Sequence, residues 1–223
     1  MHLITQSYLE QTQRWPRAGR HILAQYDDRS IIVYQAYRPS IGRWAVEHQR
    51  FGGPDFSFGR MSWIKPNFLW MMYRSAWGTS EGQQTVLAIR LRRDAFEEIL
   101  RAAVPSSFEA AARFATREQW QRAAGQSSVR LQWDPDHHPS GAKLQRRAIQ
   151  LGLRGPTLQR YAEEWILEIQ DVSHFIAEQH QHVLAQHYDR LMTPSEDVFA
   201  INDPELAARV GIGTETSQGS DVA

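Results

Sequence analysis

The sequence contains no cysteine. This absence excludes disulfides, zinc sites built from thiolates and thiol nucleophiles. No apolar run approaches the roughly 20 residues that a membrane-spanning helix needs. The first residues, MHLITQSYLEQ, lack the basic start and apolar segment of a signal peptide. We therefore expect a soluble cytoplasmic protein without a membrane partner.

Excess charge of either sign is also missing, because 25 basic residues balance 25 acidic residues. A zero net charge argues against a protein that coats nucleic acid with its whole surface, although it leaves room for a local basic cleft. Lysine is scarce and occurs only as Lys65 and Lys143. The remaining basic residues are arginines, whose planar guanidinium suits two-point binding of phosphate or carboxylate. An arginine-favouring codon usage would produce the same bias.

Three common catalytic motifs are absent. The chain has no GxxxxGK[ST] loop, no GxGxxG fingerprint and no GxSxG elbow. These absences disfavour P-loop kinases, Rossmann dehydrogenases and α/β-hydrolases.

The pattern of apolar residues predicts a single α+β domain over residues 1–203. Short β-branched or apolar segments indicate strands, and helices are expected after several proline or capping positions. The predicted strands are 30–37, 85–91, 129–133, 147–153 and 165–171. We expect them to form one mixed, mostly antiparallel sheet of about five or six strands flanked by helices. Residues 204–223 are polar and contain glycine, so they are expected to form a disordered tail.

The stretch Phe58–Gly78, FGRMSWIKPNFLWMMYRSAWG, interleaves large apolar residues with cations and holds three of the eight tryptophans. Arg38 and Lys65 each precede a proline that can open a helix. A helix start offers free amide donors to an anion, so these two positions, with Arg60 and Arg74, predict a phosphate clamp. Nearby aromatic side chains could stack a base or a nicotinamide ring: Tyr34, Tyr37, Trp63 and Trp70. Gln35 is a further ligand-binding candidate. The alternative is that the aromatic residues fill the core and the cations pair with surface carboxylates.

Two later segments carry further candidate residues. The segment QWDPDHH, residues 132–138, is interpreted as an exposed loop in which Trp133 and Asp134 contact a substrate. Asp134 or His137 could act as a general base. A metal site there is the weaker alternative, and we predict none. In a strand over 147–153, Gln150 could bind a base edge or a carboxamide, and Arg147 would lie on the opposite face. A polar sheet face would account for the same residues.

Four segments resemble a known family, the domain of unknown function 4291: SIIVYQAYRPSIGRWAVEHQRFGG, RMSWIKPNFLWMMYRSAWG, LQWDPDHHPSG and RRAIQLGLRG. The resemblance covers roughly residues 15–180. It implies a soluble, single-domain protein of microbial origin and no particular activity, so the chemistry is argued from the residues.

Two functions from different classes fit these residues. The first is an enzyme that handles a nucleotide or a nucleic-acid phosphate, in one version by transferring ADP-ribose from NAD. By analogy of element order with such transferases, Arg38 would hold NAD, Tyr37 or Trp63 would contact nicotinamide, and Glu168 would orient the ribose. Arg38, Lys65 and Glu168 are then the predicted catalytic residues. The alternative is a non-catalytic module for RNA or single-stranded DNA, in which arginines hold phosphates and tryptophans stack bases.

Overall fold

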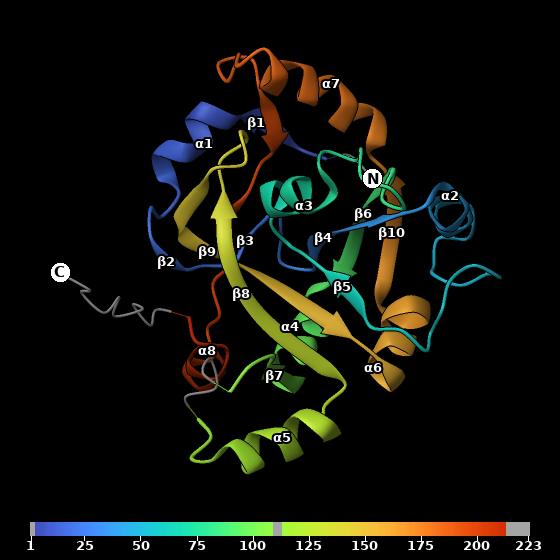
Figure 1. Cartoon of the computed structure of the whole chain (residues 1–223), viewed down its shortest axis with the longest axis vertical. Coiled ribbons are helices and arrows are strands. Elements are labelled where there is room, and N and C mark those ends of the chain that lie inside the picture. The colour runs from blue at the N-terminus through green and yellow to red at the C-terminus, as the bar shows by residue number, and fades with distance from the viewer. Residues whose placement is uncertain (1–2, 109–112, 213–223) are drawn as a thin grey trace.

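The computed structural model of the chain describes residues 3–108 and 113–212 (Figure 1). The predicted α+β class with mixed and mostly antiparallel strands is confirmed, but the strands divide among several sheets instead of forming one. Three antiparallel strands form the first main sheet and five strands form the second. Two short two-stranded ladders join β1 (Thr5–Ser7) to β11 (Met192–Pro194) and β3 (Leu23–Ala24) to β12 (Asp197–Val198).

The first main sheet has the order β10-β6-β4, with bounds Ile166–Asp171, Thr85–Arg92 and Ser30–Tyr37. Successive side chains of β4 enter different cores, because neighbouring residues of a strand point to opposite faces. Ile31 and Val33 belong to one buried cluster, and Ile32 and Tyr34 belong to another. Burial on both faces explains why this strand reads as a nearly continuous apolar run in the sequence.

The second main sheet is built on the antiparallel pair β8 (Val129–His137) and β9 (Lys143–Leu153). Three short strands join this pair: β7 (Ala103–Pro105) lies parallel to β8, while β2 (Gly19–Arg20) and β5 (Ser62–Ile64) pair with β9. β8 continues past residue 133, where the sequence predicts a loop. Asp134 lies opposite Ala148, and a register shift after Pro135 absorbs the proline.

A single bridge of two backbone hydrogen bonds connects the two main sheets. Tyr34 of β4 donates its amide to the carbonyl oxygen of Lys65 at 2.7 Å, and the Lys65 amide donates to the Tyr34 carbonyl at 3.2 Å. Lys65 directly follows β5. The bridge therefore fixes the start of the segment that leads into the next helix.

Helices lie beside and between these sheets (Figure 1). α3 (Phe68–Ser75) contacts β4 and β8, whereas α2 (Pro39–His48) packs on the three strands of the first sheet. α4 (Arg93–Ala102) contacts strands of both sheets, and α7 (Ser173–Leu184) contacts β6. The remaining helices are α1 (Tyr8–Arg14), α5 (Arg117–Gln126), α6 (Gly155–Arg160), the π-helix η1 (Tyr161–Trp165) and α8 (Pro204–Val210). None of the helices within residues 3–108 and 113–212 has the length and apolar character needed to cross a bilayer.

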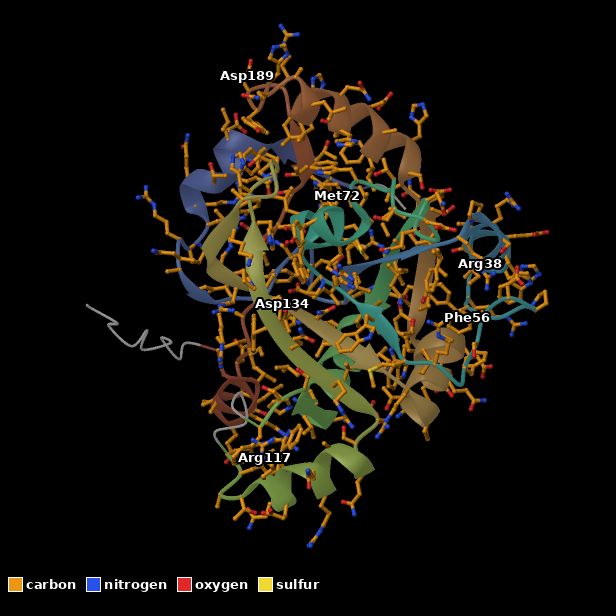
Figure 2. All side chains as sticks on the ribbon, viewed as in Figure 1. Arg38, Phe56, Met72, Arg117, Asp134 and Asp189 are labelled. Carbon is orange, nitrogen blue, oxygen red and sulfur yellow. The ribbon has the colours of Figure 1, made fainter. Side chains whose placement is uncertain are left out.

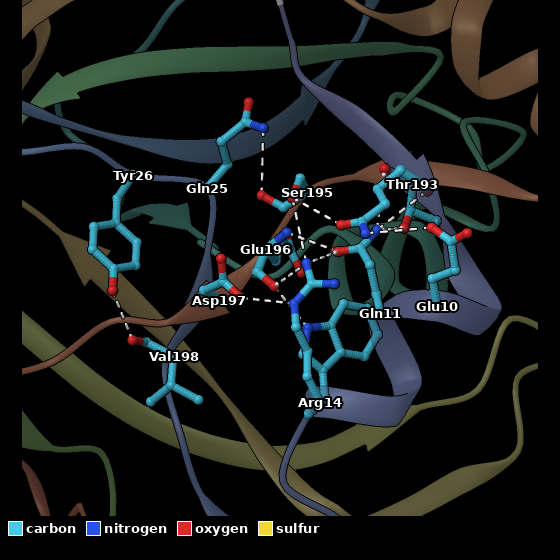
Figure 3. Close-up of polar contacts among 12 residues, drawn as sticks. Glu10, Gln11, Arg14, Gln25, Tyr26, Thr193, Ser195, Glu196, Asp197 and Val198 are labelled. Carbon is cyan, nitrogen blue, oxygen red and sulfur yellow. Dashed lines mark hydrogen bonds and ion pairs between the residues drawn. The ribbon is translucent and has the colours of Figure 1, made fainter.

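Side chains from the first 30 residues hold the segment that follows residue 190 (Figure 3). Gln11 donates to the Thr193 hydroxyl at 2.8 Å and accepts the Glu196 amide at 2.8 Å. Arg14 donates to Asp197 at 2.8 Å, and the Tyr26 hydroxyl donates to the Val198 carbonyl at 2.9 Å. Gln11 is fully buried, so the loss of its partners would leave a desolvated amide unpaired.

The region after residue 203 differs from the sequence-based expectation of a disordered tail. Pro204–Val210 form α8, which Asp203 caps by accepting the amides of residues 205 and 206. Leu206 and Val210 belong to the same buried cluster as Ile31 and Val33, and α8 contacts α4. The helix has only four apolar residues, Leu206, Ala207, Ala208 and Val210, which give a weak helical pattern among polar neighbours. Residues 213–223 lie outside the described residues.

We predict that Gly42→Ala destabilises the fold, although alanine normally favours a helix interior by about 1 kcal/mol over glycine. A Cβ at Gly42 would lie 2.7 Å from the Thr85 Cβ, a separation that packed atoms do not adopt. The free energy of unfolding should fall by about 1–3 kcal/mol. Gly125 in α5 is the matched control, because a Cβ there meets no atom within 4 Å. Urea denaturation should show Gly125→Ala unchanged or more stable; a Gly42→Ala protein of undiminished stability would contradict the packing of α2 on β6.

Candidate functional site

A cavity of about 980 Å³ opens where β4 ends and β5 and α3 begin. Its walls come from both main sheets, from the start of α2 and from the loop that contains Glu81. Figure 2 places Arg38 and Phe56 of this region near each other and marks Asp134 on β8. The sheet junction thus brings together residues that are more than 100 positions apart in the chain, such as Gln35 and Gln150.

Four cationic side chains line the cavity. Arg38, Arg60 and Arg74 are exposed, and Lys65 is buried. Within the described parts of the chain, no hydrogen bond or ion pair engages the side chain of any of the four, although Asp55 and Glu81 also line the cavity. Several unpaired guanidinium groups around one cavity favour the binding of an anion with more than one negative charge.

Lys65 is the buried member of this set, with 6% of its surface exposed. The pKa of its ammonium is lowered to about 8, mainly by burial and also by the neighbouring Arg74, while the Asp134 carboxylate acts in the opposite direction. The lowered pKa means that a sizeable fraction of the amine is neutral near pH 8.

Gln35, Tyr37 and Ser62 form one wall of the cavity, and the buried Tyr161 supports this wall from behind. The Gln35 amide donates to Ser62 Oγ at 2.8 Å and to the Tyr37 hydroxyl at 2.9 Å. Tyr161 of η1 donates to Gln35 Oε1 at 2.8 Å, and the Tyr37 and Ser62 hydroxyls are 2.5 Å apart. Burial raises the pKa of Tyr37 to about 12. Because every member is engaged, this wall is held in one arrangement and its hydroxyls are poor nucleophiles.

Two glutamines on the second sheet share one carboxylate. Gln132 and Gln150 lie opposite each other on β8 and β9. Gln132 donates to Asp134 Oδ1 at 2.8 Å, and Gln150 donates to Oδ2 at 2.7 Å. An ionised carboxylate only accepts hydrogen bonds, so both amides must turn their NH₂ groups toward Asp134. The two amide oxygens, which no described residue engages, are then available as acceptors at the cavity.

The structure gathers eight of the predicted site residues at this cavity: Gln35, Tyr37, Arg38, Arg60, Trp63, Lys65, Arg74 and Gln150. Their roles remain predictions. Asp134 stands behind Gln132 and Gln150 in β8, instead of in the loop that the sequence predicts.

The other predicted residues, Asp134 among them, do not line the cavity. Tyr34 is fully buried in the core, and Trp133 donates its indole N–H to the Val210 carbonyl at 2.8 Å. Arg147 pairs in register with Arg20 of β2. Glu168 lies in β10, which β6 separates from β4. The sequence could not show that the late strand beside the cavity is β9 and not β10.

Ser62 lines the cavity and Tyr161 supports it through Gln35, and neither is a candidate in the sequence; Gln132 belongs to the candidate segment 132–138 but was given no role of its own. Ser62 could have been noticed as a small polar residue in the extended segment before Lys65. Tyr161 had no such signal, because its contact with Gln35 spans 126 positions. No group of three or more His, Asp or Glu side chains suited to a metal ion occurs within residues 3–108 and 113–212.

We predict that Lys65→Met stabilises the protein near pH 7, because it removes a buried charge without a partner. The difference between the usual pKa of 10.5 and the folded pKa of about 8 corresponds to a cost of about 3 kcal/mol. That cost is fully present below the folded pKa and disappears as pH rises toward the unfolded value, since the unfolded chain then loses the same proton.

Urea denaturation at about pH 7 and about pH 10 tests whether the burial cost of Lys65 decreases as the pH rises. The stability advantage of Lys65→Met over the wild type should be largest at the lower pH and should shrink at the higher pH. Lys143→Met is the control, because its exposed side chain should contribute within about 0.5 kcal/mol at both values. A wild type more stable than Lys65→Met at neutral pH would contradict the burial cost.

Comparison with known proteins places the chain in a family. A search of curated proteins finds no match. Residues 21–199 match the family described as Domain of unknown function (DUF4291), in agreement with the resemblance of the sequence motifs. Because this match covers well over half of the 223 residues, the protein belongs to the DUF4291 family.

Proposed function

We propose that the cavity binds a nucleotide and that the protein is an enzyme that transfers a group from it or acts on a nucleic-acid phosphate. The observation that carries this proposal is the set of three exposed arginines and one buried lysine around a single cavity, without partners among the described residues. A guanidinium group can donate two parallel hydrogen bonds to two oxygens of one phosphate, and the anionic groups of a nucleotide are its phosphates.

The other walls support a nucleotide over a simple anion. A volume of about 980 Å³ is at the upper end of the range for small-molecule and cofactor sites. The amide oxygens of Gln132 and Gln150 suit the two hydroxyl donors of a ribose. Trp63 is half-buried and lines the cavity, where its ring can contact a base.

NAD-dependent transfer of ADP-ribose is the specific version of this proposal. Arg38 at the end of β4 would bind the pyrophosphate, and Trp63 or Tyr37 would contact the nicotinamide. The ribose contact passes from Glu168 to Gln150, because Gln150 lines the cavity. NAD is then the proposed cosubstrate, and a cytoplasmic location would supply it.

A non-catalytic site for RNA or single-stranded DNA is the second candidate. The exposure of Arg38, Arg60 and Arg74 at the cavity supports it, because a strand could pass along them. The zero net charge and the enclosed lysine favour the enzyme.

The test is ligand-induced thermal stabilisation with NAD, ATP, nucleoside monophosphates and short oligonucleotides. A ligand at one hundred times its dissociation constant adds about 2.7 kcal/mol, which raises the melting temperature of a chain of this size by about 5–10 °C. We expect NAD or another nucleotide to produce this shift.

Substitutions of cavity residues test whether the ligand-induced rise in melting temperature comes from binding in the cavity. Arg38→Ala and Arg74→Ala should each weaken nucleotide binding about ten- to one-hundredfold, the loss expected for one charge-assisted contact. Arg190→Ala, an exposed arginine outside the cavity, should bind like the wild type. Stabilisation by oligonucleotides alone, with a steep loss in salt, would favour the binding module. No shift with any ligand would contradict both candidates.

A further inference from the structure

Lys65 occupies a position that is fixed on both sides. Its backbone amide and carbonyl pair with Tyr34, and Pro66 follows it directly. Asn67 then caps α3 by accepting the Trp70 amide at 2.6 Å. The buried Glu196 accepts the Phe68 amide at 2.7 Å. The backbone at Lys65 is therefore held between a strand bridge and a helix cap. Its side chain is the part of the residue that remains available to contact a ligand.

The side chain ends at the cavity without a partner among the described residues. The charge of Asp134 acts on the Lys65 ammonium, and two glutamine amides hold the Asp134 oxygens in place. Arg74, on the following helix, repels the Lys65 charge. Desolvation and a neighbouring cation are the two features that make a lysine amine nucleophilic.

Other cavity groups are less suited to attack. Arginines stay protonated, and the hydroxyls of Tyr37 and Ser62 are bonded to each other and to Gln35. Lys143, the second lysine of the chain, is exposed on β9 and does not line the cavity. Among the described residues of the cavity, Lys65 is the amine.

We propose that Lys65 Nζ attacks the α-phosphorus of the bound nucleotide and carries the nucleotidyl group as a covalent intermediate. This inference rests on the proposed function and defines its reaction type as nucleotidyl transfer. It would replace the direct transfer of ADP-ribose, because the bond broken is a phosphorus–oxygen bond and not the bond to nicotinamide.

The step balances in atoms and electrons. The lone pair of the neutral amine forms the P–N bond, and the P–O bond to the leaving group breaks with its electron pair. Pyrophosphate leaves from ATP, and nicotinamide mononucleotide leaves from NAD. Asp134 accepts the proton that Nζ loses. In the second half, a deprotonated acceptor oxygen, such as that of a nucleic-acid phosphate, attacks phosphorus, the P–N bond breaks with its electron pair, and Nζ takes the proton back from Asp134. The exposed arginines offset the charge on the phosphoryl and leaving oxygens.

The experiment incubates the full chain with Mg²⁺ and either ATP or NAD, each radiolabelled in the phosphate next to adenosine, and follows label on denatured protein. The other three nucleoside triphosphates are tested in the same way. A phosphoramidate is acid-labile and stable in alkali, so the label should be lost in acid only. Peptide mapping is decisive, because Lys65 and Lys143 are the only lysines.

We expect label on the wild type and on Lys143→Arg, and at least a hundredfold less on Lys65→Arg. Lys65→Arg keeps the positive charge, so its thermal shift with the same nucleotide should persist and will separate loss of reaction from loss of binding. Asp134→Asn should slow labelling at least tenfold without abolishing binding.

Four outcomes would overturn the proposal. They are equal labelling of Lys65→Arg, label that maps elsewhere, a Lys65 adduct formed with release of nicotinamide, and no label from any nucleotide that stabilises the protein. In the last case binding survives, so the proposed nucleotide site stands while the covalent step fails. If no nucleotide stabilises the protein, both fail. Acetylation by acetic anhydride at about pH 7.5 tests the amine without a ligand. A lower rate of acetylation at Lys65 than at Lys143 would also contradict a nucleophilic Lys65.

Discussion

The pair of hydrogen bonds between Tyr34 and Lys65 is the interaction on which the rest of the site depends. It is the place where the three-stranded and the five-stranded sheets meet, and each sheet alone supplies only part of the cavity. The first sheet supplies the cavity residues Gln35 and Tyr37, and Arg38 follows directly after its strand β4. The second supplies the Gln132 and Gln150 pair. Fixing the two sheets at Lys65 sets the lysine between an arginine-bearing side and an amide-bearing side, which is an arrangement suited to an anionic ligand with polar groups at its other end.

A second constraint is the burial of polar groups behind this junction. Glu196 is fully buried, and burial raises the pKa of its carboxyl well above the usual value, although the Phe68 amide opposes this. Arg146 pairs with the buried Asp136 at 2.5 Å. Buried polar groups of this kind stabilise little by themselves, and their loss leaves charges or donors without partners. Their effect here is positional, because Glu196 meets the first turn of the helix that follows Lys65.

Sequence reasoning succeeded where a local pattern reflects burial. Residues 30–37 form β4 as predicted, because apolar side chains face a core on both sides of that strand. It failed where a contact between distant parts of the chain determines the local structure or the position of a residue. Asp134 reads as the start of a loop beside Pro135, yet pairing with β9 keeps it in a strand. Glu168 and Gln150 are both polar residues of late strands, and only the strand order separates them. The cations around Lys65 could be named from the sequence, whereas the support of the wall by Tyr161 could not.

The hydrogen bonds between the first helix and the segment after residue 190 also bear on synthesis of the chain. A ribosome produces Lys65 and its β4 partner early, but the Glu196 carboxylate that meets the following helix emerges about 130 residues later. Until then the α3 amide has no acceptor from this segment, and Gln11 lacks the Thr193 and Glu196 groups that satisfy it. A nascent chain that ends before residue 190 would therefore contain all the residues that line the cavity, while the helix after Lys65 would lack its Glu196 acceptor. This contact to the helix therefore forms only when the segment after residue 190 has been synthesised.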